Sequence, residues 1–182
     1  MIVEDPHAFI CPGYIIRAAS AGWEHGGAAS LRHRVFVEEQ GLFAPHDRDA
    51  IDQRAITLVA LSTIASEADE VVGTVRLHAA RRGAWWGSRL AVAPGCRRVG
   101  PLGTELIRLA VGTAMARGCG TFLAHVQARN IPLFRRIGWE VEEEVSLHGA
   151  PHARMRALLP RFTPVEDPCA GRLALARRRR AS

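Results

Sequence analysis

The chain has 182 residues, of which 48% are hydrophobic, and a formal net charge of +6 at pH 7. This length and apolar content suffice for one domain with its own hydrophobic core. No apolar run approaches the roughly 18 residues of a membrane span, and the first residues lack the cationic and apolar regions of a signal peptide. We therefore expect a single-domain cytoplasmic protein without a membrane partner.

The cysteines and the charges exclude further classes. Cys11, Cys96, Cys119 and Cys169 are scattered without a CxxC pair, so we expect reduced thiols and no metal site. All 24 basic residues are Arg, and residues 172 and 177–180 place about five of these charges near the C-terminus. A nucleic-acid-associated regulator that acts through this tail stays an alternative, although no recognition-helix or aromatic RNA-binding pattern accompanies it.

The predicted elements follow in chain order. A leader over residues 1–12 precedes a strand over 14–18, a helix over 28–40 and an acidic loop over 41–52. Three strands over 55–62, 71–78 and 85–93 lead to a helix that begins near residue 102 and stops at Gly118. A strand over 121–127, a short helix over 130–137 and strands over 140–147 and 152–158 follow. This order predicts an α/β (α+β) domain over residues 13–160.

From residue 161 onward Pro, Ala and Arg dominate the sequence. Such a composition is typical of a segment without a packed core, so we expect disorder or a loose helix over 161–182. The tail is therefore expected to be dispensable for the activity of the domain.

A basic, turn-rich loop over residues 94–103 joins the strand over 85–93 to the following helix. Unpaired amides at a helix N-terminus, the helix dipole and nearby glycines together favour an anion such as a phosphate. The P-loop motif requires a Lys that this chain lacks, and the dinucleotide motif GxGxxG is absent. An ordinary strand-turn-helix with surface arginines stays open on the loop alone.

The loop Arg98-x-x-Pro101-x-Gly103 resembles the pyrophosphate loop of the GNAT family of acetyl-CoA-dependent N-acetyltransferases, usually Arg/Gln-x-x-Gly-x-Gly/Ala. Pro101 departs from that pattern, because proline has no N–H to offer a phosphate. Asn130 and the run over 133–139 are similar to the second signature of the family, N…FYxxxGF.

Two more stretches carry the resemblance further. Arg34-x-Phe36-Val37-Glu38-Glu39-Gln40 and Gly149-x-Pro151-His152-x-x-Met155 are similar to a GNAT subgroup of ElaA-type and nitrogen-starvation-associated N-acetyltransferases. The motifs occur in the family's order between residues 34 and 158. The resemblance implies a mixed, mostly antiparallel sheet whose two central parallel strands splay apart.

The resemblance also implies where the cosubstrate acetyl-CoA binds. The pantetheine arm would lie between the strands at residues 89–92 and 121–127, as an added strand would. The pyrophosphate would bind loop amides with Arg97 and Arg98 as counter-charges, and an amide near Leu90 would stabilise the oxyanion. The expected binding residues are Leu90, Ala91, Val92, Arg97, Arg98, Val99, Gly100, Leu102, Gly103, Thr104, Asn130 and Phe134.

The expected reaction is direct attack of a small-molecule amine on acetyl-CoA, which requires a base. His152 is the first candidate because imidazole titrates near neutral pH. His125, Glu38 and Glu39 are the other candidates, and each also has an ordinary structural interpretation. The acidic loop, through Asp47, Asp49 and Asp52, is expected to add negative potential for a cationic substrate.

Phe134 stands where many GNAT enzymes carry a tyrosine that protonates the leaving thiolate, and the single tyrosine of the chain, Tyr14, is far from that motif. A non-catalytic acyl-CoA sensor is therefore the second alternative. Full similarity to an acyl-homoserine-lactone synthase, which shares the fold, is not found in the sequence. Whether the protein forms a homodimer stays open.

Overall fold

The computed structural model describes residues 13–64, 67–81, 83–98 and 101–175, and predictions for residues 1–12, Val99, Gly100 and 176–182 lie outside these ranges. The described residues form an eight-stranded sheet in the order β6-β7-β5-β4-β3-β2-β1-β8. Its strands are β1 (Gly13–Ala18), β2 (Ile56–Ile64), β3 (Glu67–Ala79), β4 (Ala84–Val92), β5 (Thr121–Gln127), β6 (Trp139–Leu147), β7 (Ala150–Ala157) and β8 (Arg172–Leu175).

The helices pack on this sheet. They are α1 (Gly22–Arg32), its π-helical continuation η1 (His33–Glu39), α2 (Leu102–Met115) and α3 (Ile131–Ile137), with short 3₁₀ turns η2 (Ala50–Gln53), η3 (Pro94–Cys96), η4 (Ala128–Asn130) and η5 (Leu159–Arg161). None of the helices in the described ranges is long and apolar enough to cross a membrane.

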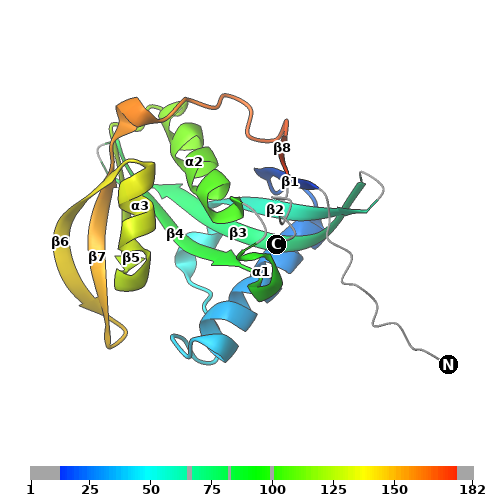
Figure 1. Ribbon diagram of the computed structural model, residues 1–182, viewed down its shortest axis with the longest axis horizontal. Helices are drawn as coiled ribbons and strands as arrows, with labels where there is room; N and C mark the ends of the chain where they lie inside the picture. The colour runs from blue at the N-terminus through cyan, green and yellow to red at the C-terminus, as the bar shows by residue number, and fades with distance from the viewer. Residues whose placement is uncertain (1–12, 65–66, 82, 99–100, 176–182) are drawn as a thin grey trace, which may run out of the picture.

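The strand directions follow from the connections. Neighbouring strands of the described sheet are antiparallel except β4 and β5, which run parallel (Figure 1). Parallel neighbours need a crossover, and α2 supplies it between β4 and β5. This confirms the predicted mixed, mostly antiparallel sheet of the GNAT fold.

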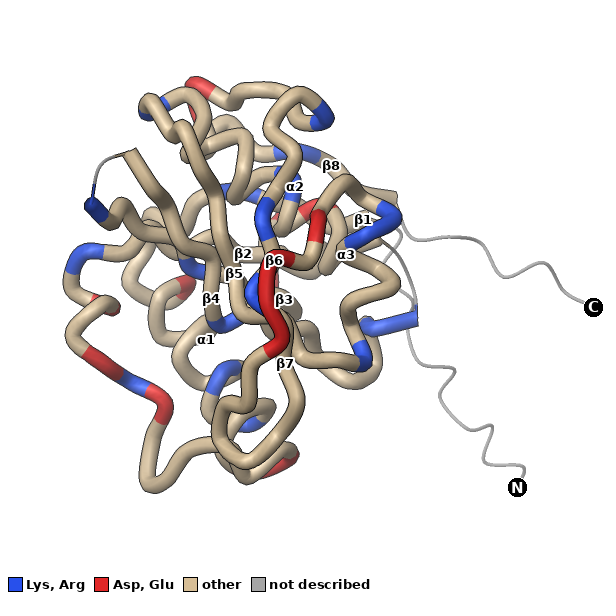
Figure 2. The backbone as a smooth tube through the Cα atoms, turned by 90° about the vertical axis from the view of Figure 1, so that its left-hand side faces the viewer, with Lys and Arg blue, Asp and Glu red and all other residues tan. Residues whose placement is uncertain are grey.

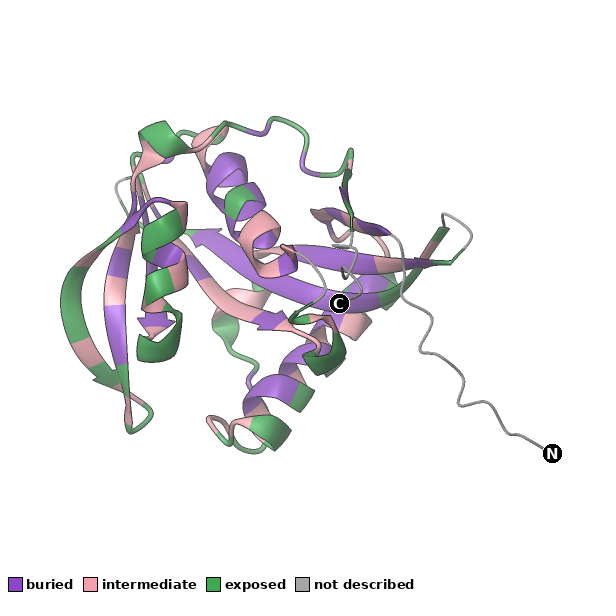
Figure 3. Ribbon diagram, in the orientation of Figure 1, coloured by how far each residue is buried: buried purple, intermediate pink, exposed green. Residues whose placement is uncertain are grey.

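Two apolar clusters cover the two faces of the sheet. The larger cluster joins α2 to β2, β3 and β5 through residues such as Leu58, Val75, Leu106 and Phe122. The smaller one joins α1 to the other face through Leu31, Val59 and Val71 among others. Strand β3 and helix α2 are accordingly buried along most of their length, whereas the edge strand β6 is largely exposed (Figure 3).

The first helix begins six residues earlier than expected, at Gly22 instead of residue 28. Gly26 and Gly27 are poor helix formers, so the sequence pattern does not indicate these turns. The buried Glu24 carboxylate accepts hydrogen bonds from the Ser20 and Ala21 amides, at 2.6 and 3.1 Å, and closes the start of the helix. Tertiary and capping contacts thus override the weak local preference.

The end of α2 is as predicted. The Gly118 amide donates to the Met115 carbonyl and the Cys119 amide to the Ala114 carbonyl, with Gly118 at φ +79°. This pair of bonds is the Schellman motif, which needs a left-handed residue and therefore favours glycine.

The segment over residues 161–175 differs from the expected disorder. The Val165 amide donates to the Gly112 carbonyl at 2.9 Å, and the Val165 side chain is buried against α2. Further on, β8 pairs antiparallel with β1 from Gly13↔Leu175 to Ile16↔Arg172. A four-residue strand of Arg, Leu and Ala has no strong local signal, and the open edge of β1 decides its conformation. Removing residues 168–182 would therefore remove part of the sheet.

Gly112 gives a test of this C-terminal packing. A Cβ at Gly112 would lie 2.5 Å from the Thr163 carbonyl oxygen, so Gly112→Ala should destabilise the protein by about 1–3 kcal/mol in chemical denaturation. The matched control is Gly26→Ala in α1, where a Cβ meets no atom within 4 Å and should stabilise by about 0.5–1 kcal/mol. Equal effects of the two substitutions would contradict the packing of residues 163–165 on α2.

Candidate active site

The sheet forks between its two parallel strands. β4 and β5 pair from Ala84↔Thr121 to Gly87↔Ala124. Beyond this point β4 follows β3 as far as Val92↔Gly73, whereas β5 follows β7 as far as Gln127↔His152. The second halves of β4 and β5 therefore diverge and leave a gap in the middle of the sheet, as the resemblance implied.

A bulge in β4 marks the point of divergence. The register with β3 shifts between Arg76↔Ser88 and Thr74↔Ala91, and Arg89, inside the shift, has φ +56°. A non-glycine residue in this region costs on the order of 1–3 kcal/mol and persists only where the surroundings fix it. The Arg89 side chain supplies that restraint: its Nε lies 3.1 Å from Asp47 Oδ2, and its guanidinium carbon lies 4.2 Å from the centre of the Phe43 ring.

Two cavities meet at the fork. One has a volume of about 530 Å³ and reaches from the loop at Phe43 through the fork to α2. The other, of about 470 Å³, lies between the end of β4, the start of α2 and α3. Both are lined by Gln40, Leu90, Arg129, Asn130 and Phe134, so they adjoin. We call them the fork cavity and the α2 cavity.

The α2 cavity has the features of an anion site. Pro101 is the N-cap of α2 and no side chain caps the first turn, so the amides of the first turn lack intrahelical partners. A Cβ on Gly103 would meet one neighbouring atom, Val92 Cγ2 at 3.9 Å, which leaves room for a group to approach the backbone. Arg97 also lines this wall, with its guanidinium paired to Glu39. These residues fit a diphosphate next to an extended chain.

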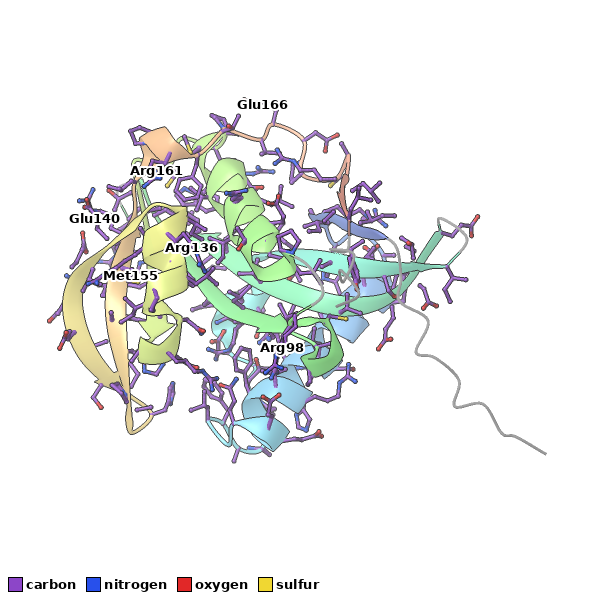
Figure 4. The ribbon with its side chains drawn as sticks, viewed as in Figure 1. Arg98, Arg136, Glu140, Met155, Arg161 and Glu166 are labelled. Atoms are coloured by element: carbon purple, nitrogen blue, oxygen red, sulfur yellow. The ribbon has the colours of Figure 1, made fainter. Side chains whose placement is uncertain are left out.

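The expected binding residues gather here. The α2 cavity is lined by Leu90, Ala91, Val92, Arg97, Leu102, Gly103, Thr104, Asn130 and Phe134. Arg98 is exposed beyond the end of β4 and does not line either cavity (Figure 4). The predicted contacts at Val99 and Gly100 lie outside the described residues.

The two candidate glutamates lie elsewhere. Both oxygens of Glu39 bind the Arg97 guanidinium, at 2.7 and 2.6 Å, and these hydrogen bonds hold the pKa of Glu39 below its usual range. Glu38 is exposed, and its carboxylate lies 3.5 Å from His33 Nε2. The structure does not bring Glu38 or Glu39 into the lining of either cavity. Glu39 instead orients Arg97, whose Nε also donates to the Val92 carbonyl.

The candidate histidines share one wall of the fork cavity. The Trp86 and His125 rings lie 4.9 Å apart. In the pairing of β5 with β7, His125 lies opposite Arg154 and Gln127 lies opposite His152, so His125 and His152 are on the same face of the sheet. Partial burial, with His152 and Arg154 nearby, lowers the pKa of His125. Next to these histidines, Arg154 and Arg156 of β7 form ion pairs with glutamates of β6. Figure 2 shows the acidic run of β6.

The geometry of His152 fixes which nitrogen can accept a proton. Its Nδ1 lies 2.9 Å from the Ala150 carbonyl oxygen, and a carbonyl only accepts hydrogen bonds. Nδ1 of the neutral ring therefore carries the hydrogen, and Nε2 carries the lone pair. The ring lines the fork cavity and is buried, so Nε2 is a potential proton acceptor in a site that is partly shielded from water.

An Arg–Asp network closes the opposite wall. Arg32 binds Asp47 and Asp52, each at 2.6 Å, and Arg76 binds Asp49 at 2.7 Å and Asp52 at 2.8 Å. Arg89 adds contacts to Asp47 and Asp49, so the cluster holds as many cations as anions. The carboxylates predicted to give negative potential are thus neutralised.

Two carboxylates of this network, Asp49 and Asp52, stay ionised. Hydrogen bonds from Arg76 lower the pKa of Asp49. Partial burial would raise the pKa of Asp52, but hydrogen bonds from Arg32, the Asp49 amide and Arg76 lower it overall. Folding therefore depends on ionised carboxylates here, and the network loses stability as the pH falls from the unfolded-state pKa values toward these lower ones.

The sequence did not identify Arg32, Arg76 and Arg89 as residues of this site. It also did not indicate that Trp139, which lines the fork cavity, has a buried N–H without a hydrogen-bond partner. A signal exists for Arg76, because it interrupts an apolar strand between Val75 and Leu77 and is buried with 2% of its surface exposed. A charge in such a position needs a partner. Among the described residues, no group of three or more His, Cys, Asp or Glu could hold a metal ion.

Asp47 tests the network. Asp47→Ala would remove one of the two carboxylates that pair with the buried Arg32 and would leave Asp52 as the other, so the free energy of unfolding should fall by about 1–3 kcal/mol in denaturant titration. The control is Glu70→Ala, which removes an exposed ion pair with Arg34 and should change stability by less than about 1 kcal/mol. A small effect of Asp47→Ala would show that the network does not hold the loop.

Comparison with known proteins agrees with this geometry. The model of the acetyltransferase (GNAT) family matches residues 28–139. The search of curated proteins gives no match. Similar solved structures include Escherichia coli ElaA, with 18% identity, a TM-score of 0.65 and coverage of 79% of this chain and 97% of that chain.

Two further structures have a TM-score of 0.64 and 20% identity, and each matches 79% of this chain. One is an acyl-CoA N-acyltransferase from Pseudomonas aeruginosa, of which 98% is covered. The other is a CoA-dependent acyl-homoserine lactone synthase, BjaI, solved with MTA, of which 82% is covered. At these identities the likeness concerns the fold, whereas the family model matches more than half of the sequence. The chain belongs to the GNAT acetyltransferase family.

Proposed function

We propose that the protein is an N-acyltransferase that transfers the acetyl group of acetyl-CoA to the amine of a small molecule by direct attack. The observation that carries the proposal is the meeting of the two cavities at the fork, with an anion site on one side and the free Nε2 of His152 on the other. The ElaA-like subgroup is part of the same proposal.

The donor occupies the α2 cavity in this proposal. Its diphosphate accepts hydrogen bonds from the first-turn amides of α2 beside Arg97, and its pantetheine arm lies between the diverging strands. Pro101 offers no amide, so the contacts fall on Leu102, Gly103 and Thr104. The thioester then lies near Leu90, where the two cavities adjoin and a β4 amide can stabilise the oxyanion.

The acceptor amine enters from the histidine wall. A primary ammonium has a pKa near ~10, so it must lose a proton before it attacks. His152 Nε2 takes that proton, directly or through one water, as the C–N bond forms and the C–S bond breaks. A small acceptor is favoured because the Phe43 and His148 rings, 4.7 Å apart, bridge the loop and the β6–β7 turn beside the cavity.

The leaving thiolate has no side-chain acid at the position where the family signature has one. Phe134 is buried against Trp139, with ring centres 5.1 Å apart. Tyr14 lies in β1, next to the outermost strand on the other side of the sheet. A thiol pKa near ~8.5 makes the thiolate a tolerable leaving group, and solvent protonates it.

Donor binding should depend on Gly103. Gly103→Val places a branched side chain where the diphosphate approaches the backbone and should weaken acetyl-CoA binding about ten- to hundred-fold in calorimetry. Gly120→Val is the control, because a Cβ there meets no atom within 4 Å and the residue precedes β5 at the end remote from the fork. Unchanged affinity in Gly103→Val would contradict the assigned anion site.

Turnover should depend on His152. With an amine acceptor found by screening, His152→Ala should lower kcat by about 10²–10⁴ while acetyl-CoA affinity is kept, as measured by thiol release and calorimetry. His25→Ala, on the exposed side of α1, should match the wild type. An unchanged kcat in His152→Ala would remove this residue as the base. Donor binding without turnover on any amine would favour the acyl-CoA sensor.

A further inference from the structure

The charged groups that line the fork cavity do not balance. Among the described residues, the lining holds a single carboxylate, that of Asp49. It also holds three guanidinium groups, those of Arg76, Arg89 and Arg129. Both oxygens of Asp49 are occupied, because Arg76 donates to each of them at 2.7 Å and Arg89 approaches Oδ2 at 3.4 Å. The described lining therefore offers no free carboxylate to a second cationic group of the acceptor, such as that of a diamine.

Arg129 differs from the other two arginines of the lining. The Arg–Asp network engages Arg76 and Arg89, whereas no carboxylate in the described ranges lies within ion-pair distance of Arg129. Glu39 does not serve as its partner, because both Glu39 oxygens already bind Arg97. These hydrogen bonds, with a smaller contribution from the charge of Arg129, lower the pKa of Glu39. Within the described part of the chain, Arg129 is thus an unpaired cation, and it lines both cavities.

The backbone places Arg129 close to the candidate base. In the pairing of β5 with β7, Gln127 lies opposite His152, and Arg129 follows Gln127 by two residues. Two residues span at most about 7 Å, so the Arg129 side chain starts near the wall that carries His152. Gln127 Nε2 donates to Gln40 Oε1 at 2.9 Å, and this hydrogen bond ties down the end of β5. We therefore expect a small molecule in the fork cavity to contact Arg129 and His152 together.

The remaining ionisable groups of the histidine wall do not repel an anion. His125, His148 and His152 line the cavity, and an imidazole ring is either neutral or cationic. A carboxylate at Arg129 gains charge-assisted hydrogen bonds that a neutral group of the same size does not gain. A second ammonium in the same place would instead meet an unpaired guanidinium of like charge.

We propose that the acceptor is an amine that also carries a carboxylate, and that Arg129 binds this carboxylate while the amine faces His152. The inference rests on the proposed acyltransferase function and adds the chemical class of the acceptor. The transfer step stays the same: the C–N bond forms, the C–S bond breaks, and the carboxylate is unchanged. Arg129 is a specificity-determining residue in this proposal and takes no proton.

The test compares amino acids with their carboxamides, which have the same size but no negative charge. Glycine, β-alanine, 4-aminobutyrate and phenylalanine, each with its carboxamide, are titrated by calorimetry into the full chain saturated with CoA. CoA has no acyl group to transfer, so the titration reports binding alone. We expect at least one acid to bind about five- to tenfold more tightly than its carboxamide; exposure of Arg129 and screening by salt limit the ratio. With acetyl-CoA, the same acid should have the lower KM in thiol release.

Variants assign the effect to one side chain. Arg129→Gln removes the charge, so the ratio of acid to carboxamide affinity should fall toward one. Differences in amine pKa between an acid and its carboxamide cancel, because the ratio is compared between variants. Arg129→Lys keeps the charge without the planar fork and should keep part of the ratio. The matched control is Arg136→Gln on α3, an exposed residue that lines neither cavity, and it should keep the wild-type ratio.

The outcomes separate the two proposals. If neither CoA nor acetyl-CoA binds, the proposed function fails. If both bind but no acid in the panel binds more tightly than its carboxamide, the acceptor class is refuted and the proposed function stands. If a preference for acids persists in Arg129→Gln, the carboxylate binds elsewhere and the role of Arg129 is wrong. If Arg129→Gln instead weakens acetyl-CoA binding about tenfold and leaves the ratio unchanged, Arg129 serves the donor, which also overturns the inference.

Discussion

The fork between β4 and β5 is the constraint on which the rest of the structure depends. Two parallel strands that stayed paired would hydrogen-bond to each other along their whole length and would close both cavities. The divergence starts at the bulge around Arg89, whose positive φ is held by Asp47 and Phe43. A strained residue is therefore fixed by a salt bridge and an aromatic contact from a loop more than 40 positions earlier in the chain.

That loop explains why the Arg–Asp network matters beyond stability. Burying Arg32 and Arg76 is costly unless each is paired, and the loop supplies three carboxylates that meet this need. The same pairing removes the net charge from one wall of the fork cavity. In the proposed reaction, recognition of the acceptor then depends less on a field of acidic residues and more on the shape and hydrogen bonds of the histidine wall.

The two walls divide the chemistry of the proposed reaction. His152 is held in one tautomer by a backbone carbonyl, so its proton-accepting nitrogen is prepared before any substrate binds. On the other side, Glu39 holds Arg97 at the end of β4, beside the uncapped start of α2. The candidate base and the donor site are thus oriented by separate elements, which is why substitutions at Gly103 and His152 are expected to have separable effects.

The sequence by itself determined the order of the elements, the strand nature of β4 and β5, the Schellman end of α2 at Gly118 and the basic loop before α2. These features follow from local periodicity and from turn residues with specific backbone conformations. They also suffice for the family, because its motifs lie on those local elements.

Only the tertiary structure decided the pairing of Asp47, Asp49 and Asp52 with arginines, the place of Glu39 on Arg97 and the added strand β8. Each of these depends on which distant segments become neighbours. A carboxylate in a loop has the same local sequence whether it faces solvent or an arginine on β3. Long-range packing, which no local pattern encodes, makes that distinction.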